Sequence, residues 1–227
     1  MQKSYYFCIH IIIMPTTMKR KRYQLLAPLL IKNLQKRHYD AYYCPTAADI
    51  RDKVKALMPA GSSVSWGGSE TIRKSGVTAM LKQGGYVVYD RDEATNEQEK
   101  LAIYRKAFEC DYYLTSVNAM SQDGVIINID GNGNRVAAIT WGPTHVILIV
   151  SMNKVCPDVD TAIKRARCVA APTNMMRFDT LRTPCKTDGT CHDCLSPDSI
   201  CNYICLQRMS HPAHRHIVLL TDEDLGY

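Results

Sequence analysis

The sequence has no apolar run long enough to cross a membrane. The apolar stretch near its start, Tyr5–Ile13, is much shorter than the roughly 20 residues that a membrane-spanning helix requires. This stretch resembles the core of a signal peptide, but no small-x-small cleavage site separates it from the basic run Lys19–Arg22. We therefore interpret residues 1–17 as a leader that is non-structural or a wrongly assigned start, with translation from Met14 or Met18. We expect a cytoplasmic protein without a membrane partner.

Several catalytic signatures are also absent. The sequence contains no G-x-S-x-G, H-E-x-x-H or Walker-type motif. It therefore offers no obvious nucleophile and leaves open whether the protein is an enzyme. The net charge of +6 could indicate a nucleic-acid partner, but much of it lies in Lys19–Arg22. We interpret this run as the solvated start of a helix and expect no nucleic-acid binding.

The rest of the chain alternates short apolar runs with helical patterns. This alternation predicts an α/β fold with a mainly parallel sheet and helices on both faces. An inserted antiparallel strand is expected at residues 124–130, before an Asn-Gly turn. We predict a single domain over residues 18–227. Strands are expected at 40–44, 62–66, 86–90, 112–116, 145–150 and 216–220. Helices are expected at 18–37 (interrupted near its first turns by Pro28), 47–58, 95–109 and 158–170, with one or two short helices over 69–82 and a short helix or extended piece at 135–141.

Two glycine-rich loops directly follow expected strands. In the first, Gly67 and Gly68 precede Ser69, which stands where a helix N-cap belongs, and Glu70 opens the helix. Such a loop can bring backbone N–H groups close to an anion. Tight turns are the alternative use of these glycines. The second loop carries a polar turn with an arginine at its exit, and its candidate binding residues are Asp130, Gly131, Gly133, Asn134 and Arg135.

Further polar residues, Thr115, Asn118 and Asp123, stand at or just after strand ends. Each could serve only its own turn. Their density near Arg135, whose guanidinium suits a carboxylate or phosphate, favours a site for a small anionic ligand at the carboxyl edge of the sheet. We predict that one pocket is faced by Gly67, Gly68, Ser69, Thr115, Asn118 and Arg135.

The ten cysteines fall into two groups. Cys8, Cys44, Cys110, Cys156 and Cys168 are scattered, and we expect them to be small buried hydrophobic residues. The others cluster near the end of the chain, in a cysteine-rich segment at residues 183–205. This clustering in a cytoplasmic protein favours metal or redox chemistry over a disulfide framework. The clustered residues are Cys185, Cys191, Cys194, Cys201 and Cys205.

Four of the clustered residues form a candidate metal site, the cysteine quartet: Cys185, Cys191, Cys194 and Cys201. Four thiolates could complete a zinc site or anchor an iron–sulfur cluster, and redox-labile thiols or local packing are the alternatives. Cys205 lies on a helical pattern and is expected to take no part. His211, His214 and His216 are expected to form a loop leading into the last strand.

In its two glycine-rich loops and its cysteine-rich segment, the chain resembles the LUD (lactate utilisation) domain family over roughly residues 20–227. Within this family it is similar to the lactate-utilisation protein C type. The matching blocks are Ser65–Ser69, Leu114–Ala119, Asp123–Gly124, Asn128–Ala137, Ala170–Asn174, Pro184–Asn202 and Leu225–Tyr227.

This resemblance implies a fold similar to the sugar-phosphate isomerase and CoA-transferase superfamily. It also implies a part in oxidising lactate to pyruvate beside iron–sulfur partner proteins. The chain departs from the family pattern where Lys74 and Gln122 replace acidic residues. This departure puts a general acid or base at those positions in doubt, and Glu70 is an uncertain substitute.

Three functions remain open from the sequence. The first is an accessory protein of a lactate-oxidising redox system that binds a small anionic ligand. The second is a stand-alone enzyme on a sugar phosphate or a CoA ester, by analogy of fold. The third is a ligand-sensing protein without chemistry. The ligand and the oligomeric state stay open in all three.

Overall fold

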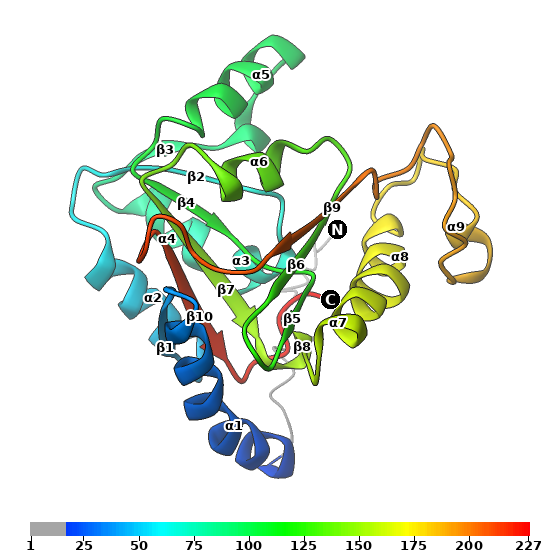
Figure 1. Ribbon diagram of the computed structural model, residues 1–227. Coiled ribbons are helices and arrows are strands. Elements are labelled where there is room, and N and C mark those ends of the chain that lie inside the picture. The colour runs from blue at the N-terminus through cyan, green and yellow to red at the C-terminus, as the bar shows by residue number, and fades with distance from the viewer. Residues whose placement is uncertain (1–16) are drawn as a thin grey trace, which may run out of the picture.

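A six-stranded sheet forms the centre of the protein. The computed structural model describes residues 17–227, and all six strands run parallel in the order β1-β10-β7-β4-β2-β3 (Figure 1). The predicted α/β fold with a mainly parallel sheet is confirmed. In order across the sheet the strands are β1 (Asp40–Tyr43), β10 (His216–Thr221), β7 (His145–Ser151), β4 (Tyr112–Thr115), β2 (Ser63–Trp66) and β3 (Val87–Tyr89).

Strand β7 shows why the sheet is buried on both faces. Residues Val146–Ser151 are all buried, and successive side chains point to opposite sides of a strand. Leu148 packs into the apolar core on one face, whereas Ile147 and Ile149 pack into the core on the other. A continuous apolar run is therefore what a central parallel strand requires.

Helices cover each face of this sheet. On one face lie α1 (Thr17–Lys36), through Leu30 and Leu34, and α6 (Asn134–Thr140), through Ile139. The helix α1 continues through Pro28, so the expected interruption there is wrong. The opposite face carries α2 (Ala47–Leu57), α3 (Glu70–Lys74) and α4 (Val77–Gln83), and α5 (Glu97–Lys106) follows the short η1 (Arg91–Glu93).

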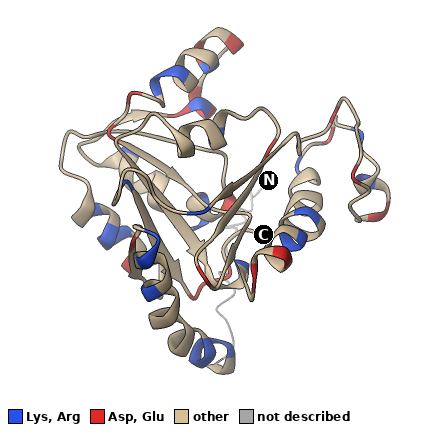
Figure 2. Cartoon of the chain, viewed as in Figure 1, with Lys and Arg blue, Asp and Glu red and all other residues tan. Residues whose placement is uncertain are grey.

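The basic run at the start of α1 is only partly solvated. Lys19 lies 2.5 Å from Asp224, and Arg20 lies 3.7 Å from Asp222, so the helix start is joined to the segment after β10. Lys and Arg elsewhere are spread over α2, α5 and α7 (Val159–Arg165) as well as α1 (Figure 2). The expectation of a simply solvated run is therefore corrected.

A second, smaller sheet packs beside the first. Its order is β8-β5-β6-β9, with β5 (Ala119–Ser121) and β6 (Ile126–Asp130) antiparallel, as predicted for residues 124–130. The strand β8 (Val155–Cys156) pairs with β5, and β9 (Tyr203–Gln207) runs antiparallel to β6. Cys205 therefore lies on a strand, and its expected helical pattern is wrong.

One long helical segment covers the small sheet. It runs through α7, a π-helical turn η3 (Ala166–Ala170) and α8 (Ala171–Met175), and it packs through Ala162 and Ala166. Cys44, Cys110 and Cys156 are buried as expected, but Cys168 on this helix is exposed, contrary to expectation. Residues 1–16 of the expected leader, Cys8 among them, lie outside the residues that the structure describes, whereas Thr17 begins α1.

Two short elements complete the chain: η2 (Met152–Lys154) after β7, and α9 (Cys185–Asp188) in the cysteine segment. His214 forms a hydrogen bond with Asp40 just before β10. His216, the first residue of β10, forms a hydrogen bond with Ser210. Within residues 17–227, no helix has both the length and the apolar character needed to cross a membrane.

Candidate functional site

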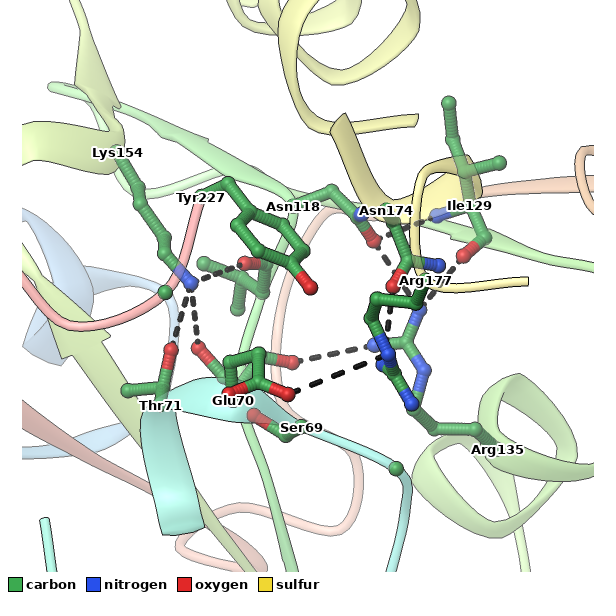
Figure 3. Close-up of a pocket in the computed structure, with 14 residues that line it drawn as sticks. Ser69, Glu70, Thr71, Asn118, Ile129, Arg135, Lys154, Asn174, Arg177 and Tyr227 are labelled. Carbon is green, nitrogen blue, oxygen red and sulfur yellow. Dashed lines mark hydrogen bonds and ion pairs between the residues drawn. The ribbon is translucent and has the colours of Figure 1, made fainter. Parts of the chain in front are cut away.

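A polar cavity of about 70 Å³ lies at the carboxyl edge of the large sheet, where ligands bind in sheets of this kind. The loops after β2, β4, β7 and β10 converge on it because all four strands are parallel. We call it the strand-end cavity, and Figure 3 shows its side chains. It is lined by Gly68, Ser69, Glu70, Thr71, Ser116, Val117, Asn118, Ile129, Arg135, Lys154, Asn174, Arg177, Gly226 and Tyr227.

A buried lysine forms one wall of this cavity. Lys154 ends η2, just beyond the central strand β7, and only 3% of it is exposed. Its ammonium donates hydrogen bonds to Thr71 Oγ1 at 2.8 Å, Ser116 Oγ at 3.1 Å and the Val117 carbonyl at 3.3 Å (Figure 3). All three acceptors are uncharged, and within residues 17–227 no carboxylate pairs with it.

Burial, together with the positive charges of Arg165 and Arg135, lowers the pKa of Lys154 to about 7. Desolvation disfavours the charged form of an amine, which is why burial acts in this direction. An amine with this pKa can bind an anion as ammonium or accept a proton when neutral. Both uses are open to a small ligand in the cavity.

Arg135 lies on the same cavity, but its guanidinium already forms hydrogen bonds within the protein. Its Nη1 donates to Asn128 Oδ1 at 2.6 Å and to the Ser116 carbonyl at 3.2 Å, and its Nη2 donates to the Ile129 carbonyl at 2.7 Å and to Asn118 Oδ1 at 3.1 Å. The Nε lies 3.5 Å from Asp130 Oδ2. Arg135 therefore joins β6 to the loop after β4, and it does not offer the free bidentate fork that its residue type suggests.

Gly67 allows this arginine to lie where it does. A Cβ at position 67 would stand 2.8 Å from Arg135 Cδ and 3.0 Å from the Tyr113 hydroxyl. The next residue, Gly68, similarly has a guanidinium nitrogen of Arg91 where a Cβ would stand. The glycines of this loop thus serve the close approach of two arginines.

Substituting Gly67→Ala should displace Arg135 and lower the free energy of unfolding by about 1–3 kcal/mol, the range for overpacking a filled site. Gly85→Ala is the matched control, since a Cβ there meets nothing within 4 Å. Urea denaturation measures both variants. Equal stability of the two would contradict the close-approach argument.

Glu70 and Arg177 form the mouth of the cavity. Arg177 follows α8, its side chain is 33% exposed, and its Nη1 donates to Asn174 Oδ1 at 3.0 Å. The carboxylate of Glu70 lies 4.0 Å from Arg177 but only 2.5 Å from Arg73. Because the Glu70 carboxylate pairs with Arg73, which does not line the cavity, the cavity keeps an excess of positive charge.

The segment after β10 closes the cavity from the side of Lys154. The Leu225 carbonyl accepts hydrogen bonds from Thr71 and Ser151, and the Leu225 N–H donates to Ser151. Gly226 then takes a left-handed φ of 69°, with Thr71 and Lys154 directly beside it. This turn brings Tyr227 over the cavity (Figure 3), where burial raises the pKa of its hydroxyl.

Of the residues expected to bind a ligand, five line this cavity: Gly68, Ser69, Glu70, Asn118 and Arg135. Ser69 is the N-cap of α3, as predicted. Gly67 lies behind Arg135 and does not line the cavity. Asp130 also stands behind Arg135, where it accepts hydrogen bonds from the backbone of Asn132, Gly133 and Val136.

Five other candidate residues do not line this cavity, among them Thr115, which was expected to face the same pocket as Ser69 and Arg135. Thr115 is buried and donates to the Ser116 carbonyl, and Asp123 pairs at 2.5 Å with Arg37, the residue after α1. The remaining three serve the turn into α6: Gly131 packs on Ile200, Gly133 packs on Tyr203, and Asn134 starts the helix and lines a groove with Tyr203.

The cavity is also lined by residues that were not expected from the sequence: Thr71, Lys154, Asn174, Arg177 and Tyr227. Lys154 carried one usable signal, because it follows the fully apolar strand at the centre of the sheet and is flanked by Asn153 and Val155. A lysine in that position lies at the carboxyl edge of the sheet. Arg177 has no comparable signal, since it reaches the cavity from the end of a separate helix.

The cysteine quartet lines a second cavity, the thiol cavity, of about 60 Å³. Ile129 lines both cavities. Within residues 17–227, no three His, Cys, Asp or Glu side chains are arranged to hold a metal ion. A zinc ion needs sulfur ligands at about 2.3 Å, so the quartet as it stands does not form a zinc site.

Comparison with known proteins identifies the family. The sequence profile of the LUD domain matches residues 27–221. A search of curated proteins finds no match. Among solved structures, a DUF162 family protein from Deinococcus radiodurans is 13% identical, with 89% of this chain and 97% of that chain covered and a TM-score of 0.49. The eIF2B delta structure from Chaetomium thermophilum is 12% identical, with 61% and 57% covered and a TM-score of 0.34.

The assignment rests on the family match alone, because the TM-scores of both solved structures are below 0.5. It extends from α1 to the end of β10 and includes Arg135, Lys154 and Arg177. The chain therefore belongs to the LUD domain family, which is associated with lactate utilisation.

Proposed function

We propose that the protein is an accessory component of a lactate-oxidising redox system and that its strand-end cavity binds a small carboxylate, such as a 2-hydroxy or 2-oxo acid. The observation that carries this proposal is the buried ammonium of Lys154, which has only uncharged partners within residues 17–227. A buried charge without a counter-charge is costly. An anionic ligand would supply that counter-charge.

The hydrogen-bonding groups around Lys154 support the same ligand class. Asn118 Oδ1 and Asn174 Oδ1 accept from arginines, which leaves their amide N–H groups as donors. The Ser116 hydroxyl accepts from Lys154, and its own proton meets no acceptor within residues 17–227. The hydrogen-bond acceptors at the cavity are thus occupied within the protein, whereas donors remain for a ligand. A carboxylate, which only accepts hydrogen bonds, requires this arrangement.

Iron–sulfur partner proteins complete the proposal as the electron carriers of the redox system. This part rests on the family membership, because the cavity itself contains only acid–base and hydrogen-bonding groups. The strand-end cavity would then present or sense the organic acid. Cytoplasmic residence is part of the same proposal.

Isothermal titration calorimetry with L-lactate and with pyruvate tests the ligand class, with inorganic phosphate as the comparison anion. Substituting Arg177→Gln should weaken carboxylate binding roughly ten- to hundredfold, the loss expected for a hydrogen bond to a charged group. Its melting temperature should change little, because Arg177 lies at the cavity mouth. Arg167→Gln is the matched control, since its side chain is 34% exposed and lies on the thiol cavity instead.

Arg167→Gln should leave carboxylate affinity unchanged. If neither acid binds to the unaltered protein, the proposed function is wrong. If binding is equal in both arginine variants, the strand-end cavity is not the binding site.

A further inference from the structure

The cysteine quartet comes from three parts of the segment before β9. Cys185 begins α9, Cys191 and Cys194 lie in the loop that follows, and Cys201 lies just before β9. All four line the thiol cavity, and none forms a disulfide. The segment brings the four thiols together although they are spread along it.

A cation stands on the same cavity as the four thiols. Arg167 lines the thiol cavity from the helix beside it, where it pairs with Asp193. Four free thiols with a nearby cation form a concentrated set of soft ligands.

The rest of the segment does not explain why the thiols are gathered. No residue from Pro184 to Met209 is buried, and Leu195 is fully exposed. Figure 1 shows the part around α9 projecting beside α8. A stretch without buried side chains has little apolar burial to offset the entropy of ordering it. Ligand bonds from the thiols would supply the missing stabilisation.

A single zinc ion and an iron–sulfur cluster differ in how far apart they hold their thiolate ligands. A single zinc ion would hold its sulfur ligands about 3.8 Å apart, given tetrahedral bonds of about 2.3 Å. Residues 17–227 contain no group arranged for a single ion. A cluster of several irons binds each thiolate at a different iron, so its ligands stand farther apart around a larger body.

We propose that the cysteine quartet binds an iron–sulfur cluster of the four-iron type, with one thiolate on each iron. Each thiol gives up its proton on binding, and Arg167 offsets part of the resulting negative charge. The apolar side of the cavity, which includes Ile129, Met175 and Ile204, shields the cluster from solvent. Cys168 and Cys205 do not line this cavity and take no part.

The position of the cluster has a consequence that rests on the proposed function. The α8 helix and the residues after it present Met175 to the thiol cavity and Asn174 and Arg177 to the strand-end cavity. The two cavities also share Ile129. A cluster there would place an electron carrier of the redox system in the same chain as the carboxylate site.

Anaerobic reconstitution of the full chain with iron, sulfide and dithiothreitol tests the cluster. We expect about four irons and four sulfides per chain, with broad visible absorption that dithionite bleaches. Cys191→Ser and Cys194→Ser should each lower the iron content at least twofold. Cys168→Ser should retain it. Since this test uses no organic acid, its outcome is independent of carboxylate binding.

Thiol alkylation provides a second readout that needs no variant. In the reconstituted protein, mass spectrometry after iodoacetamide treatment should find the quartet protected and Cys168 modified. Removing the iron with a chelator and an oxidant-free denaturant should expose all four thiols. Retention of one zinc per chain, or four quartet thiols that stay reactive after reconstitution, would overturn the proposal.

Discussion

Replacing Arg135 with methionine should lower the free energy of unfolding by roughly 3–5 kcal/mol, the loss that follows when one partner of a buried charge network is removed. Only 13% of the Arg135 side chain is exposed. Its guanidinium donates to two carbonyls and two amide oxygens and lies beside Asp130. The variant would leave the Asn128 amide oxygen and the Ile129 carbonyl without this donor.

Urea denaturation followed by circular dichroism measures this loss. Arg177→Met is the control, because it removes an arginine from the same cavity at an exposed position. Its effect should stay within about 0.5 kcal/mol, as for other surface substitutions. If Arg135→Met unfolds no more easily than Arg177→Met, the guanidinium network is not a main support of the fold.

The large sheet could be predicted because its strands are buried on both faces. The apolar run of β7 and the helical patterns between strands are local features of the sequence. The strand β9 could not be predicted in this way. It is half-exposed, it contains Cys205 in a polar stretch, and it exists because β6 pairs with it from residues 126–130.

The position of the site was predictable, but the roles within it were not. Parallel strands place their carboxyl ends at one edge, so Ser69 after β2 and Asn118 after β4 had to lie near one another, whereas Arg135 follows β6 of the small sheet. The sequence suggests a ligand-binding arginine, whereas the fold surrounds Arg135 with acceptors of its own. An Asp-Gly turn likewise suggests a site residue at Asp123, but α1 brings Arg37 to it from far along the chain.

Lys154 escaped prediction because its role depends on three-dimensional burial. A lysine in a short loop is usually solvated. Here Thr71 of α3, Val117 of the loop after β4 and Gly226 of the segment after β10 enclose it. The place of Lys154 just beyond β7 is therefore its one sequence signal, and that signal does not show that the side chain is buried.

Carboxylate binding at the strand-end cavity should weaken about tenfold for each pH unit above pH 7. The pKa of Lys154 is about 7 in the free protein, lowered chiefly by burial. A bound carboxylate stabilises the ammonium form and therefore raises that pKa. Below pH 7 the ammonium is already present and affinity is flat; above pH 7 binding must also take up a proton, which costs a factor of ten per unit until the pKa of the complex is reached.

The other ionisable groups at the cavity do not produce this slope. Arginine side chains keep their proton in proteins, Glu70 is paired with Arg73, and burial raises the pKa of Tyr227. Calorimetric titration with L-lactate at pH 6, 7, 8 and 9 and constant ionic strength measures the slope, because lactate itself stays ionised throughout. Lys154→Met should bind more weakly and show no slope from pH 6 to pH 9. An unaltered protein whose affinity is the same at pH 6 and pH 9 would show that the ligand does not depend on the charge of Lys154.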